Sequence, residues 1–149
     1  MVDFKKILFL ILIGFTCSSY GVSIGTNTDC NSESLLYNFD DNSIDPDFKI
    51  VFYSSYISFD PDYTFREVMN KDNADVVIED SLNSDFSVCQ SSKGIIIKTL
   101  DYDVDPDFIV KISNFEYMPD FTIYNNSKFL SLKKAISLII VLNILNTQR

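Results

Sequence analysis

The sequence predicts a mainly β fold, a small sandwich or barrel of about 7–8 short repeat strands with one C-terminal helix. A short pattern recurs along the chain: a proline or small residue, an aspartate, then apolar residues at alternate positions. Such alternation is typical of strands with one buried face, because successive side chains point to opposite sides. Near the C-terminus the pattern gives way to a longer apolar run, which favours a helix.

Six units carry the pattern with its aspartate. These aspartates are Asp47, Asp62, Asp75, Asp85, Asp107 and Asp120. The first and third residues after each turn, such as Phe48 and Ile50, share one face and are expected in the core. Proline suits the turn before a strand, and an aspartate beside it is expected to accept hydrogen bonds from nearby turn amides. The aspartates are therefore interpreted as structural turn residues rather than as a binding row.

Two further strands extend the repeat. Residues 94–98 are predicted to form a strand without the aspartate, and residues 34–39 are a candidate edge strand. The rest of 22–44 shows no period and is expected to be an irregular lead-in. Because no linker divides the sequence, we expect a single β-repeat domain over residues 22–149.

The C-terminal helix is predicted at about 128–146, after a turn and candidate cap at 125–127. Lys133 and Lys134 give its first turns a polar side, whereas 138–142 is apolar all round. Such a segment is expected to be buried, with the helix covering one opening or face of the β structure. Its β-branched residues leave a terminal strand over 138–145 as the alternative. The run is too short to span a membrane.

Residues 1–21 have the order of a secretory signal peptide. Lys5 and Lys6 precede the apolar run 7–15, and small polar residues follow. We expect cleavage after Gly21 and export to the periplasm or the medium. The alternative is an uncleaved N-terminal segment that tethers the chain to the membrane.

The mature chain is predicted to be acidic and to contain one disulfide. Losing Asp3, Lys5 and Lys6 with the signal peptide would move the net charge from −9 to −10. This charge disfavours nucleic acid and anionic membranes as partners, keeps the protein soluble, and would attract a basic protein partner. Cys30 and Cys89 are the two cysteines left, so a bridge between them is predicted, with a buried free thiol at Cys89 as the alternative.

Several kinds of chemistry are disfavoured by composition. The chain has no histidine, which excludes imidazole-based triads and zinc sites, and no tryptophan to stack on a sugar. A pair of carboxylates could still act as acid and base, but the aspartates fall at repeated turn positions. The sequence therefore predicts neither an enzyme nor a cofactor.

A weak calcium candidate lies in the densest acidic stretch, with alternate carboxylates at Asp101, Asp103, Asp105 and Asp107. Pro106 stands where a calcium loop needs glycine, and Ile112 stands where it needs a bidentate glutamate. We expect these carboxylates to be solvated and to hold no metal.

The repeated aspartate-hydrophobic units resemble bacterial exported proteins of unknown function built from tandem short "Ala/Pro-Asp-hydrophobic" strand repeats. The resemblance covers roughly 45–124, where Asp75 follows an alanine and Pro46, Pro61, Pro106, Pro119 or Ser84 takes that place elsewhere. It implies a repeat architecture and carries over no functional residue. We therefore expect a non-catalytic binding or structural module of the cell envelope. The alternative is an inhibitor or immunity-type protein that binds a basic secreted partner through its acidic surface.

Overall fold

The computed structural model describes residues 21–27, 30, 34–53, 60–81, 84–103, 105–113 and 118–147. The expected signal peptide therefore lies outside the described residues, except for Gly21. Within them the chain forms nine strands, one 3-10 turn and one α-helix. The strands are β1 (Val22–Asn27), β2 (Leu35–Phe39), β3 (Phe48–Tyr53), β4 (Tyr63–Glu67), β5 (Val76–Glu79), β6 (Phe86–Gln90), β7 (Ile95–Leu100), β8 (Phe108–Ile112) and β9 (Phe121–Asn126). The 3-10 turn is η1 (Lys71–Asn73), and the helix is α2 (Leu132–Thr147). The predicted mainly β class with one C-terminal helix is confirmed.

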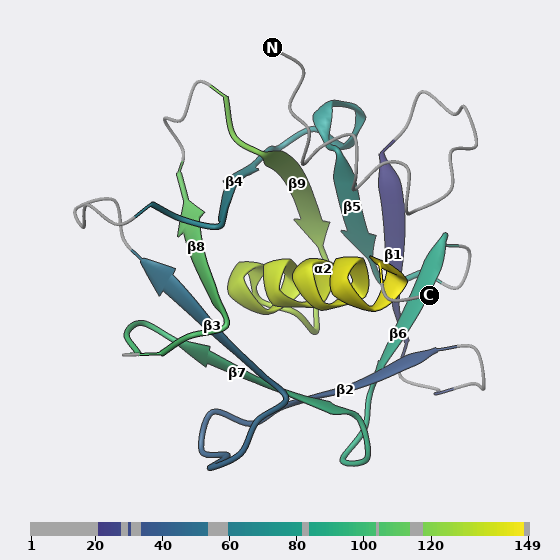
Figure 1. The fold of residues 1–149 in the computed structure, drawn as a ribbon. Coiled ribbons are helices and arrows are strands. Elements are labelled where there is room, and N and C mark those ends of the chain that lie inside the picture. Colours follow the sequence, from purple (N-terminus) through teal and green to yellow (C-terminus); the bar gives the residue numbers. More distant parts are fainter. Residues whose placement is uncertain are drawn as a thin grey trace.

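The strands close into an all-parallel barrel in the order β1-β5-β9-β4-β8-β3-β7-β2-β6 (Figure 1). Strands that follow each other in the chain do not pair. Each strand is followed by the strand two places further round, so β1 and β2 flank β6, and β2 and β3 flank β7. The chain thus passes around the barrel almost twice, and the second passage fills the gaps left by the first.

The register makes the barrel wide enough to hold a helix. In every pair except β1–β5, the first residue of one strand lies level with the third residue of its neighbour. A stagger of this size tilts the strands by roughly 50° and gives a backbone radius of roughly 10 Å. An α-helix with its side chains is about 10–12 Å across, which leaves room for one layer of strand side chains around it.

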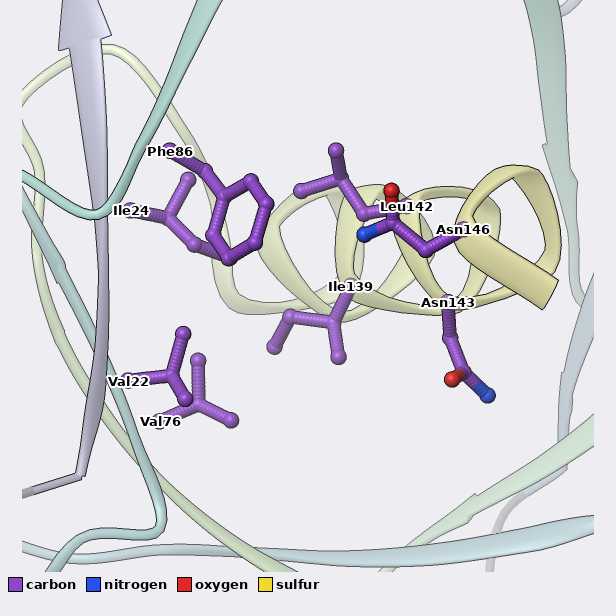
Figure 2. Close-up of a pocket in the computed structure, with 8 residues that line it drawn as sticks. All are labelled: Val22, Ile24, Val76, Phe86, Ile139, Leu142, Asn143 and Asn146. Atoms are coloured by element: carbon purple, nitrogen blue, oxygen red, sulfur yellow. The ribbon is translucent and has the colours of Figure 1, made fainter. Parts of the chain in front are cut away.

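Helix α2 occupies the interior of this barrel (Figure 1). All seven residues of the run 135–141 are buried, so the helix is enclosed on every side. This corrects the expectation that the helix covers an opening, and it excludes the alternative of a terminal strand. A cavity beside the C-terminal half of the helix measures only about 10 Å³ (Figure 2).

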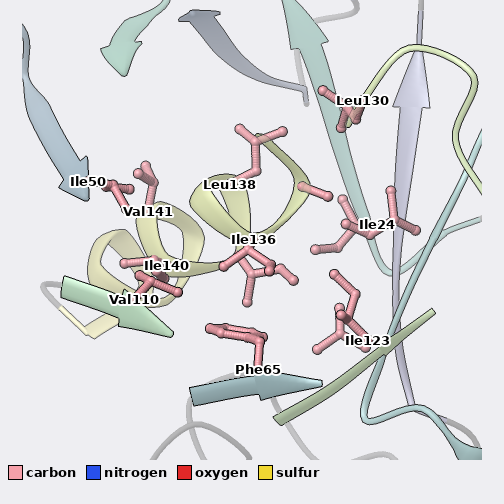
Figure 3. Close-up of a cluster of buried hydrophobic side chains, with 14 of the residues drawn as sticks. Ile24, Ile50, Phe65, Val110, Ile123, Leu130, Ile136, Leu138, Ile140 and Val141 are labelled. Carbon is pink, nitrogen blue, oxygen red and sulfur yellow. The ribbon is translucent and has the colours of Figure 1, made fainter. Parts of the chain in front are cut away.

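The core is built from the third residue of every strand. These residues are Ile24, Tyr37, Ile50, Phe65, Ile78, Val88, Ile97, Val110 and Ile123, each at most 3% exposed. In Figure 3 Phe65 of β4 and Ile136 of α2 point toward each other, and both belong to the buried cluster. The predicted inward faces are therefore correct. Burial is deepest at this third position, whereas Phe48 and Phe108, at the first position, are only partly buried.

Three local expectations were wrong. Residues 22–27 form β1 rather than part of an irregular lead-in, because Val22 and Ile24 alone give this strand too short an apolar alternation to be noticed. Strand β2 is not an edge strand, since it pairs with β6 on one side and β7 on the other. The helix begins at Leu132 rather than near 128, and Ser131, not residues 125–127, caps it through its hydroxyl on the Lys134 amide.

Two connecting loops run over the outer face of the strand that lies between the two strands they join. The β5–β6 loop comes so close to β1 that a Cβ on Gly25 would lie 2.3 Å from the Ser81 carbonyl oxygen. Likewise the β2–β3 loop accepts a hydrogen bond at the Ser43 carbonyl from Lys98 Nζ of β7, at 3.0 Å. Outward residues under the loops, such as Val51, are consequently buried as well.

Candidate functional site

The six repeat aspartates each cap a strand that is distant in sequence. Each carboxylate accepts a hydrogen bond from the amide of the second residue of a neighbouring strand, 47 to 62 residues away. The pairs are Asp47–Ile96, Asp62–Ile109, Asp75–Thr122, Asp85–Ser23, Asp107–Lys49 and Asp120–Thr64, at 2.6–2.8 Å. The structural role expected from the sequence agrees with this geometry. The expected partners, nearby turn amides, were wrong.

Three of these contacts are reciprocal. The Asp75 amide donates to the Thr122 carbonyl at 3.0 Å while its carboxylate accepts from the Thr122 amide at 2.7 Å. Asp62 makes the same two hydrogen bonds with Ile109, and Asp107 makes them with Lys49. The stagger explains why a carboxylate is useful at this position. The neighbouring strand begins two residues earlier, so the carboxylate accepts from an amide of that strand before the backbone pairing of the two strands begins. This arrangement is an aspartate clamp between parallel strands.

Glycine or serine stands at the clamp position in front of the other three strands. Gly21 precedes β1, Ser34 precedes β2 and Gly94 precedes β7. The Ser34 hydroxyl hydrogen-bonds the Ser87 hydroxyl of β6 at 2.8 Å, which is a neutral version of the clamp. At Gly94 a Cβ would lie 2.4 Å from the Tyr37 nitrogen, so the backbone itself occupies the space of the carboxylate.

The predicted disulfide is present between Cys30 and Cys89, whose Cα atoms are 5.3 Å apart. Cys89 points outward from β6 and is 1% exposed, and Cys30 lies between β1 and β2 in the chain. The bond therefore fastens Cys30 to strand β6. This geometry excludes the alternative of a buried free thiol.

The four carboxylates of the calcium candidate are not brought together. Asp101 pairs with Lys133 Nζ, Asp103 accepts from the Asp105 amide at 3.1 Å, and Asp107 clamps β3. Among the described residues, no group of three or more acidic or cysteine side chains is arranged to hold a metal ion.

The acidic stretch does, however, lie beside a second acidic loop. Residues 40–47 connect β2 to β3 and residues 101–107 connect β7 to β8, and β3 pairs with β7. We call these two loops the acidic loop pair, and it contains Asp40, Asp41, Asp45, Asp47, Asp101, Asp103, Asp105 and Asp107. The sequence drew attention to residues 101–107 but gave no sign that they lie beside residues 40–47.

Asp80 is a structural carboxylate that sequence reasoning missed. It accepts hydrogen bonds from the Thr26 hydroxyl (2.5 Å), the Ser127 hydroxyl (2.7 Å) and the Lys128 amide (3.0 Å). Asp80 thus holds the start of the segment that connects β9 to α2. Desolvation alone would raise the pKa of Asp80, but the three hydrogen bonds outweigh it and lower the pKa below its ordinary value. Its position one residue after β5, outside the repeat, gave no signal.

The small cavity lies among β1, β5, β6 and α2 (Figure 2). It is lined by Val22, Ile24, Val76, Phe86, Ile139, Leu142, Asn143 and Asn146. About 10 Å³ is at most the space of one water molecule, so the cavity cannot take a substrate. Asn143 Oδ1 is buried there without a hydrogen-bond partner among the described residues. Burial raises the pKa of Tyr63, and a hydrogen bond with the Asn143 side chain opposes that shift.

The surface carries a few large exposed apolar side chains. They are Ile44, Met69, Tyr102, Met118 and Phe129, all in loops. Among the described residues no helix combines the length and the apolar character needed to cross a bilayer. Comparison with known proteins finds no matching family model, no curated protein and no solved structure similar to this chain.

Proposed function

We propose that this protein is an exported, non-catalytic binding module. The observation that carries the proposal is the filled interior: α2 occupies the space in which β-barrels commonly hold a ligand. Recognition then falls to the loops outside the barrel, whose described segments carry exposed aspartates and are hydrogen-bonded to strands at several points. A rigid scaffold that presents loops is a common arrangement for binding proteins.

Two features support export. The disulfide between Cys30 and Cys89 would persist in an oxidising compartment and not in a reducing cytosol. The first strand begins at Val22, directly after the expected cleavage position. N-terminal sequencing of the exported protein should find Val22 as its first residue. Recovery of Met1 on the exported species would refute the cleavage.

The repeat aspartates support a non-catalytic role, because each one already serves the backbone of a neighbouring strand. A carboxylate engaged in this way is poorly placed to move protons to and from a substrate. An enzymatic activity that is lost on a single aspartate substitution, in a variant that keeps its fold, would overturn this part of the proposal.

Binding can be tested with the disulfide-bonded protein immobilised on a matrix and exposed to the envelope and extracellular fractions of its host. We expect one protein to be retained in stoichiometric amount and to be released by excess soluble bait. The same chain, reduced and unfolded, is the matched control because its charge and composition are identical. Equal retention by both baits would contradict a folded binding surface.

A second candidate function, inhibition of a basic secreted protein, is favoured by the acidic loop pair. Its two loops are distant in the chain but are attached to the neighbouring strands β3 and β7 by Lys49 and Lys98. The negative field of such loops steers an oppositely charged partner and raises its association rate. The retained protein should then be basic, and its association rate should fall steeply with added salt.

A further inference from the structure

Two large apolar side chains stand at the surface of the acidic loop pair. Ile44 is fully exposed in the first loop, and Tyr102 keeps 69% of its surface accessible in the second. Neither side chain contributes to the core inside the barrel. Acidic loops alone would only promote solubility, and exposed apolar residues scattered singly are common. Two such residues in adjoining loops, by contrast, indicate an interaction site.

The strands beneath hold the two loops next to each other. Lys49 of β3 and Lys98 of β7 are register partners on adjacent strands, and both point outward. Lys98 Nζ donates to the carbonyl of Ser43, which precedes Ile44, at 3.0 Å. Lys49 Nζ donates to the Asp105 carbonyl at 2.5 Å. Each of these two lysines thus attaches one loop to its strand. Ile44 and Tyr102 therefore belong to loops that are attached to the neighbouring strands β7 and β3.

Further contacts fix the shape of these loops. Asp41 Oδ1 accepts from both the amide and the hydroxyl of Thr99, at 3.0 and 3.1 Å. Asp101 pairs with Lys133 of α2, so the second loop is also held to the helix inside the barrel. A surface that is already ordered loses little conformational entropy when it binds, which favours its use as an interface.

All charged side chains within the two loops themselves are aspartates. Asp41, Asp45 and Asp105 are exposed, and the lysines beneath them are engaged with loop carbonyl oxygens. Apolar anchors surrounded by charged groups are the usual arrangement of a protein interface. A complementary partner must bring lysine or arginine to meet the aspartates and an apolar surface to cover Ile44 and Tyr102.

We infer that the acidic loop pair is a docking surface for a basic protein, with Ile44 and Tyr102 as its apolar anchors. This inference rests on the proposed binding function and assigns that function a place and a class of partner. The aspartates accelerate encounter and select against acidic proteins, while the two anchors supply affinity.

The test uses three peptides of equal length as probes: alternating lysine and leucine, alternating lysine and serine, and alternating glutamate and leucine. Calorimetric titration of the disulfide-bonded protein should show that the lysine–leucine peptide binds about tenfold more tightly than the lysine–serine peptide. The glutamate–leucine peptide should not bind. Equal affinity for the two lysine peptides would overturn the inference, because only diffuse charge attraction would then be present.

Matched variants locate the surface. Ile44→Ser with Tyr102→Ser should abolish the advantage of the lysine–leucine peptide. Met69→Ser with Met118→Ser removes two equally exposed apolar side chains from other loops and should leave that advantage intact. Loss in the methionine variant, or no change in the Ile44 and Tyr102 variant, would refute the assignment. Far-ultraviolet circular dichroism checks that both variants keep their fold.

The same variants separate this inference from the proposed function. If the host protein retained by the wild-type bait is retained equally by the Ile44 and Tyr102 variant, the docking surface is wrong and the binding function stands. If neither bait retains a protein, the binding function fails in that host fraction, and the peptide titrations still decide whether this surface recognises basic apolar chains.

Discussion

Removing one aspartate clamp should weaken a strand that lies far away in sequence. Asp75 is the best position for the test, because its carboxylate accepts from both the amide and the hydroxyl of Thr122, at 2.7 and 2.8 Å, and is only partly exposed. A hydrogen bond to a charged group contributes about 1.5–3 kcal/mol, and water can partly replace it at a half-exposed site. Asp75→Ala should therefore lower the free energy of unfolding by about 2 kcal/mol.

Two companion variants sharpen the measurement. Asp75→Asn keeps an acceptor oxygen and loses only the charge, so it should cost about 1 kcal/mol. Asp72→Ala, on the exposed turn η1 three residues earlier, should change stability by less than about 0.5 kcal/mol. Urea denaturation followed by circular dichroism gives all three values, and the slope against urea should stay constant.

Hydrogen exchange at Thr122 distinguishes a clamp from a local turn residue. In Asp75→Ala the Thr122 amide loses its acceptor, so its protection should fall more than that of other amides in β9. A local role would instead confine the change to residues around 73–76. If Asp75→Ala were as mild as Asp72→Ala and left Thr122 protected, the clamp would have no energetic importance.

Three further predictions follow from the packing and the charges. Phe65→Ala should cost about 3–5 kcal/mol because Phe65 is fully buried, whereas Phe48→Ala, at the partly exposed first position, should cost less than half of that; equal costs in urea melts would contradict the buried central layer. Replacing Cys30 and Cys89 together with alanine should remove about 4 kcal/mol on the chain-entropy estimate, and alkylation of the exported wild-type protein should find no free thiol; two alkylatable thiols would refute the bond. Because the pKa of Asp80 is lowered in the folded state, its contribution to stability is complete above about pH 4 and disappears as the pH falls through the folded-state pKa. The melting temperature of wild type should therefore approach that of Asp80→Asn on acidification. A difference in melting temperature that does not change with pH would argue against this contribution.

The inward faces of the strands and the order of elements are properties of the sequence alone. Alternation places Ile50 and Phe65 inward because the side-chain period of a strand is two whatever its neighbours are. The apolar run in α2 predicts that the helix is buried on every side. Cys30 and Cys89 are the two cysteines outside the expected signal peptide, so the sequence also predicts their disulfide. Strand β1 escaped notice because Val22 and Ile24 are its only apolar residues that alternate.

Strand order, closure and the partners of the aspartates were decided only by the tertiary structure. Each unit carries nearly the same local signal, so nothing in a single unit states which strand will lie beside it. Pairing of β3 with β7 and β8 depends on the chain passing almost twice around a helix that follows all nine of these strands in the sequence. The sequence placed Asp107 at a turn, but its partner, the amide of Lys49, comes from a strand 58 residues away. A carboxylate accepts whichever amide the fold brings within reach, so the residue type could be read from the sequence and the partner could not.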